Sequence, residues 1–180
     1  MQSKARMTLA GAVALAALSA GVPAALHAQR ALAPIRVTGE RLAEADRLDS
    51  LAEALHSTPR QWREAARLHE RAAGLRSAAD PRGVAGFRMA AHLYRAAGDL
   101  GRARSAMERA GELAASRGDV VTAANTYVDA GLLALENRRY DQVDAMARKA
   151  EAMAYSPLLS ELQRATIMNR VGYSQLLAAR

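Results

Sequence analysis

Apolar residues recur at steps of three and four along most of this chain. Between Glu40 and about His56 the spacing places the apolar side chains on one face of a helix, and they are Leu42, Ala45, Leu48, Leu51, Ala52 and Leu55. The same spacing continues through six further stretches, which end near residues 77, 97, 116, 136, 154 and 178. The pattern therefore predicts seven helices joined by short turns and no strand.

Short turn signals separate these stretches. Thr58-Pro59 and Asp80-Pro81 each place a capping residue before a proline, and Gln61 would complete a capping box with Thr58. Gly98-Asp99 and Gly118-Asp119 combine a glycine suited to a left-handed helix end with an aspartate suited to capping the next helix. Asn137 is predicted to take the place of glycine in the turn that follows.

The pattern also repeats in pairs of helices. The second helices align through Trp62-x-x-Ala65, Leu100-x-x-Ala103 and Tyr140-x-x-Val143, at offsets of 38 and 40 residues. The first helices align less well, with Phe87…Tyr94 matching Tyr127…Ala134. Repeats of this length are typical of stacked helical hairpins, in which neighbouring pairs bury each other's apolar faces.

Residues 84–117 resemble the tetratricopeptide repeat, a helix–turn–helix unit of 34 residues. The large, small and turn positions of that unit are matched by Phe87, Ala90-Ala91, Tyr94, Gly98-Asp99, Ala103, Met107 and Ala110. The resemblance extends over roughly residues 40–157, although the offsets of 38 and 40 exceed the family unit. It implies an all-α fold, a right-handed α-solenoid of about three stacked repeats plus a C-terminal closing helix.

On this interpretation the repeat domain spans residues 40–180. Its helix pairs cover about 40–78, 82–117 and 119–154, and the closing helix covers 157–178, beginning at Ser156-Pro157.

The N-terminus has the composition of a secretory signal peptide over residues 1–28. Lys4 and Arg6 precede an uncharged, Ala- and Leu-rich stretch, and cleavage after Ala28 or after Ala24 fits the small residues there. Residues 29–39 would then be a linker. We expect an exported protein, periplasmic or extracellular and without stable membrane insertion once cleaved; the alternative is an uncleaved anchor over residues 7–26.

The amino-acid composition limits the kinds of site and partner that the chain can have. Half of the residues are hydrophobic but only 4% are aromatic, which favours thin, closely packed helices. The absence of cysteine excludes disulfides, thiol catalysis and zinc–thiolate sites. The net charge of +7 comes almost entirely from arginines interleaved with acids, as on solvated helix faces, so a nucleic-acid partner is not expected.

No catalytic, cofactor or metal site is predicted. The four histidines lack the two-histidine spacing of a helical metal site, and no serine lies in a nucleophile-elbow pattern. The stretch Gly98 to Gly101 lacks the strand and the Lys-Ser/Thr pair of a phosphate loop. We therefore expect a protein that is not an enzyme.

The family resemblance implies a concave groove, lined by the first helices, that takes peptides. Six residues would face it, three on the central first helix and three on the next one: Arg88, His92, Arg95, Asn125, Asp129 and Leu132. The function expected from this is a scaffold that binds a protein or peptide. Two alternatives stay open, a groove for an acidic polymer or nucleic acid and a stripe that is merely solvated.

Overall fold

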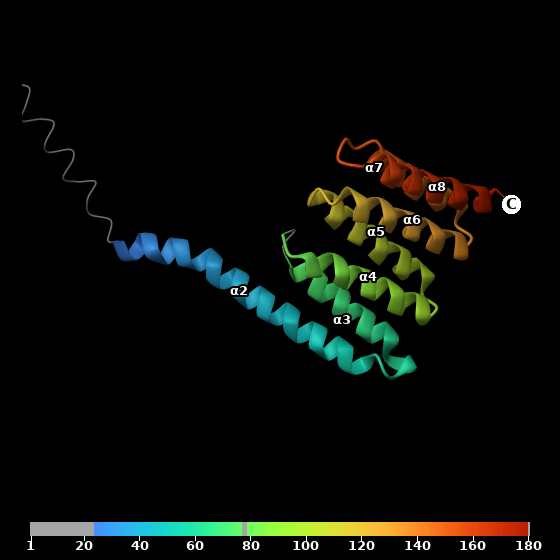
Figure 1. The fold of residues 1–180 in the computed structure, drawn as a ribbon. Helices are drawn as coiled ribbons and strands as arrows, with labels where there is room; N and C mark the ends of the chain where they lie inside the picture. Colours follow the sequence, from blue (N-terminus) through green and yellow to red (C-terminus); the bar gives the residue numbers. More distant parts are fainter. Residues whose placement is uncertain (1–23, 77–78, 180) are drawn as a thin grey trace, which may run out of the picture. The chain divides into compact units, whose positions relative to one another are not determined.

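The computed structural model describes residues 24–76 and 79–179, with side chains from residue 38 onward. Over these residues the chain forms seven α-helices and one 3-10 helix, and it contains no strand. The helices are α2 (Ala24–Leu55), α3 (Trp62–Leu75), α4 (Pro81–Ala96), α5 (Leu100–Ser116), α6 (Val120–Glu136), α7 (Tyr140–Ala154) and α8 (Glu161–Ala178), with η1 at Pro59–Gln61 (Figure 1). The all-α class is confirmed.

The chain divides into two parts, residues 1–40 and 41–180. In the second part each helix from α3 to α8 packs against the next one, and α8 also packs against α6 (Figure 1). The core is built largely from alanines with no exposed surface, among them Ala65, Ala90, Ala103, Ala124 and Ala150. Small side chains at the seams let helices approach closely, while Phe87, Tyr94, Met107 and Tyr127 fill the wider spaces.

Equivalent side-chain contacts occur in successive helix pairs. Arg109 lies 4.4 Å from the ring centre of Phe87, and its Nη1 pairs with Glu70 at 2.7 Å. One pair later, Lys149 lies 5.4 Å from the ring centre of Tyr127, and its Nζ pairs with Glu108 at 2.7 Å. A cation on a second helix thus covers an aromatic ring of a first helix and is held by a glutamate of the preceding second helix.

The turn signals were partly right. Gly98 has φ 77° and Gly118 has φ 74°, and the following aspartates cap α5 and α6 by accepting hydrogen bonds from backbone N–H groups, as predicted. In the third turn, however, the left-handed residue is Arg138 with φ 55°, not Asn137. The turn geometry requires a positive φ at the position directly before the N-cap, and Asn137 lies one residue too early.

Other helix boundaries also differ from the prediction. The stretch 29–39, predicted to be a linker, is helical, because α2 runs through it with Pro34 inside the helix. Proline removes one helical hydrogen bond, but α2 continues past it to Leu55. The helix α8 begins at Glu161 rather than 157, since Ser160 and Gln163 form a reciprocal capping box. Thr58 makes no side-chain cap, because Pro59–Gln61 forms a 3-10 turn before α3.

The predicted signal peptide over 1–28 and the alternative anchor over 7–26 lie largely outside the described residues, and both stay predictions. Among the helices that the structure describes, none is both long enough and apolar enough to cross a membrane.

Candidate functional site

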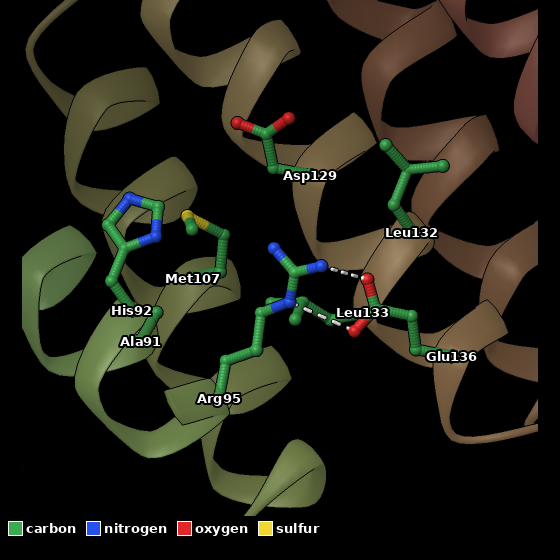
Figure 2. Close-up of a pocket in the computed structure, with 8 residues that line it drawn as sticks. All are labelled: Ala91, His92, Arg95, Met107, Asp129, Leu132, Leu133 and Glu136. Atoms are coloured by element: carbon green, nitrogen blue, oxygen red, sulfur yellow. Dashed lines mark hydrogen bonds and ion pairs between the residues drawn. The ribbon is translucent and has the colours of Figure 1, made fainter. Parts of the chain in front are cut away.

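A pocket of about 240 Å³ opens between α4 and α6. Helix α4 contributes one wall, α6 contributes the opposite wall, and α5 contributes part of the floor. The lining residues are Ala91, His92, Arg95, Met107, Asp129, Leu132, Leu133 and Glu136 (Figure 2). Three successive helices therefore build one site.

The floor of the pocket is apolar. Ala91, Met107 and Leu133 are buried in the core of the helix stack, with exposed fractions of 0%, 2% and 5%. Ala91 is small, so α4 leaves a space here that a larger side chain would fill. Leu132 is half-buried on the opposite wall, and the pocket can therefore take an apolar group from outside.

Charged groups form the rim of the pocket. The Arg95 guanidinium extends across it to Glu136, with Nη2–Oε1 at 2.6 Å and Nε–Oε2 at 3.0 Å (Figure 2). Both side chains are substantially exposed, at 56% and 39%. An exposed ion pair of this kind contributes at most about 1 kcal/mol, so a ligand can displace it at modest cost.

The second carboxylate of the rim is held by the last helix. Arg170 on α8 donates through Nη2 to Asp129 Oδ1 at 2.6 Å and through Nη1 to Asn125 Oδ1. This bridge fixes Asn125 and Asp129 against α8 and neutralises the carboxylate. The positive charge of Arg170 and the negative charge of Asp129 are therefore matched within the protein.

Four of the six predicted site residues line the pocket together: His92, Arg95, Asp129 and Leu132. Asn125 does not line it, because Arg170 engages its side chain one turn earlier on α6. Arg88 lies one turn before His92 on the same stripe of α4, is exposed, and forms no ion pair with the described residues.

Sequence reasoning missed Met107, Glu136 and Arg170. The two charged residues had a usable signal, since Arg95 and Glu136 are 41 residues apart, as are Asp129 and Arg170. At this separation Arg95 on α4 meets Glu136 on α6, and Asp129 on α6 meets Arg170 on α8. Met107 had no such signal, because its side chain reaches the pocket from the second helix through the core.

Two histidines form a separate cluster between the end of α2 and the middle of α3. His56 Nε2 and His69 Nε2 share a hydrogen bond of 2.9 Å, and His69 Nδ1 lies 2.7 Å from Asp49 Oδ1. The two rings are tilted by 54° with a centroid distance of 5.1 Å, so they also pack against each other. Among the described residues, no three His, Asp or Glu side chains are grouped to hold a metal ion.

The pocket thus combines an apolar floor with a rim of paired charges and the imidazole of His92, and the guanidinium of Arg88 lies one turn away on α4. Such a site can hold a side chain and hydrogen-bond to the backbone beside it. No protein-family model matches this sequence, and no curated protein matches it either.

Proposed function

We propose that this chain is a non-catalytic interaction scaffold of the tetratricopeptide type. In this proposal three helix pairs form a right-handed α-solenoid, α8 closes the stack, and the protein is exported through its N-terminal signal. An extended segment of a protein or peptide binds across α4 and α6.

The recurring contacts support the repeat arrangement. Glu70 pairs with Arg109 and Glu108 pairs with Lys149, at separations of 39 and 41 residues. These separations agree with the offsets of 38 and 40 between the aligned second helices. Sequence periodicity and three-dimensional contacts therefore have the same period, as expected for a stack in which each pair contacts its neighbours.

The apolar-floored pocket carries the functional proposal. Pockets for drug-sized ligands and cofactors usually measure roughly 300–1,000 Å³, whereas this one measures about 240 Å³. A single apolar side chain fits such a volume better than a whole metabolite. The exposed stripe of α4 and α6 on either side offers room for the backbone that carries this side chain.

The charges favour a peptide over an acidic polymer. A polyanion binds to unpaired cationic side chains, which displace the counterions bound to it. Arg95 and Arg170 are already paired with Glu136 and Asp129. Among the described residues of this face, Arg88 and His92 are the basic groups without a carboxylate partner. Two such groups suit one carboxylate or carbonyl of a ligand better than a long acidic chain.

The test uses displayed random twelve-residue peptides selected on the full-length chain, with affinities measured by fluorescence anisotropy. We expect Leu132→Gln to weaken the selected peptides about tenfold, which is roughly the transfer cost of one apolar contact. Arg148→Gln is the matched control, because Arg148 is exposed on α7 and has no partner among the described residues. Circular dichroism should show the same helix content in both variants.

Failure to enrich any peptide, or equal binding by wild type and Leu132→Gln, would contradict the proposal. A polyphosphate chain serves as the probe for the alternative. Tight polyphosphate binding that falls steeply with salt would favour the acidic-polymer function instead.

A further inference from the structure

Helix α8 has two contrasting faces. One face is buried in the helix stack and carries Ile167, Val171 and Ser174. The other face carries Leu162, Tyr173 and Leu176, which are 78%, 58% and 55% exposed. Exposed large apolar side chains gathered on one helix face are a mark of an interaction surface.

The exposed face follows the spacing of a coiled-coil seam. Leu162, Ala165, Asn169, Gly172 and Leu176 are separated by alternating steps of three and four residues, and all five are exposed. This is the a/d pattern that lets one helix pack along another. No charged residue interrupts the seam, although the whole chain has a net charge of +7.

We propose that a second copy of this chain docks on this seam, with the two α8 helices antiparallel and a two-fold axis at Asn169. The sequence is self-complementary about that residue. Leu162 of one copy then faces Leu176 of the other, and Ala165 faces Tyr173, so that large side chains meet small or apolar ones. Closed two-fold dimers require such a self-complementary patch.

Asn169 fixes the register of this pair. Its side chain makes no hydrogen bond within the described residues, and at the axis it meets its own counterpart. The two asparagine amides can hydrogen-bond to each other there. A single asparagine in an apolar seam selects one register over others. The antiparallel arrangement also places opposite ends of the helix dipoles together.

The area is sufficient for a weak dimer. The seam from Leu162 to Leu176 spans about 21 Å, and Leu158, which precedes it, is 74% exposed. Burying these side chains removes roughly 500 Å² from each copy, or about 1,000 Å² in total. That value lies at the lower limit for specific interfaces, so the dimer forms in a concentration-dependent way.

The register is tested by disulfide trapping. The chain has no cysteine of its own, so every crosslink must come from the introduced cysteines. In the full-length chain, Asn169→Cys should form a covalent dimer on mild oxidation, since the two sulfurs meet at the axis. Leu162→Cys alone should form no covalent dimer but should crosslink when mixed with Leu176→Cys. Self-crosslinking of Leu162→Cys without crosslinking of Asn169→Cys would overturn the antiparallel register.

Association is tested by sedimentation equilibrium of the unmodified full-length chain. The weight-average mass should rise towards that of a dimer with concentration, and Leu162→Glu should abolish the rise without loss of helix content. Tyr140→Glu is the control, because Tyr140 is 50% exposed on α7 outside the seam, and it should dimerise like the wild type. A chain that stays monomeric at all concentrations, or a Leu162→Glu variant that still dimerises, would overturn the proposal. The seam would then be expected to bind another segment or another protein.

Discussion

The contact between Gly111 on α5 and Tyr127 on α6 makes a sharp test of the packing between neighbouring helix pairs. A Cβ atom on Gly111 would lie 2.8 Å from Tyr127 Cε1 and 2.9 Å from Cδ1. The ring is 5% exposed and lies under the Lys149 ammonium. The substitution Gly111→Ala therefore forces a buried ring to retreat by about 0.6 Å to regain an ordinary contact distance.

Two effects of opposite sign determine the outcome. Alanine is more favourable than glycine inside a helix by about 1 kcal/mol. Overpacking a well-filled core costs about 1–3 kcal/mol. The Tyr127 ring is enclosed by its neighbours and cannot move away freely. We therefore expect the cost of overpacking to exceed the gain in helix propensity, and the free energy of unfolding to fall by about 1 kcal/mol.

The assay is urea unfolding followed by circular dichroism. Gly101→Ala is the matched control on the same helix, since nothing lies within 4 Å of the added methyl group. We expect this control to be as stable as the wild type or more stable by up to about 1 kcal/mol. Equal stabilisation by Gly111→Ala and Gly101→Ala would refute the close approach of α5 to Tyr127.

Two further outcomes follow from the turns and from the charge network. Arg138→Gly should raise the free energy of unfolding by about 1 kcal/mol, because a non-glycine residue at φ 55° is strained; an unfolding midpoint at or below that of the wild type would contradict this. Burial raises the pKa of Glu108, but hydrogen bonds from Lys149 and Arg104 outweigh it and hold the pKa below its usual value of 4.5. Its stabilising effect should therefore be present above that pH and lost as pH falls through the lowered value, so the stability difference between wild type and Glu108→Gln should shrink in acid. A difference that stays constant from about pH 6 to pH 3 would count against the network.

Much of the fold could be predicted from local patterns. Periodic apolar positions located α3 to α7, and Gly98-Asp99 and Gly118-Asp119 marked two turns correctly. These signals succeed because the helix period and the capping rules act over a few residues. Boundaries without such a signal failed, as at the start of α8, where Ser160 rather than Ser156 caps the helix.

Only part of the candidate site could be predicted from such local patterns. The stripe of Arg88, His92 and Arg95 follows from helical spacing alone. Which of these residues are free depends on partners about one repeat away, and the sequence does not show that Glu136 reaches Arg95. The pocket itself exists because Ala91 is small at a point where Met107 and Leu133 leave space.

The sequence by itself determined the helical class, and because it contains no cysteine it also excluded disulfides and thiol chemistry. It also contained the self-complementary seam of α8, although only the exposure of Leu162, Tyr173 and Leu176 distinguishes that seam from a buried face. The tertiary structure decided which charges are neutralised, where the pocket lies and which residue takes the left-handed turn. The physical reason is range: propensity and periodicity act within one helix, whereas burial and ion pairing depend on groups that lie some 40 residues apart.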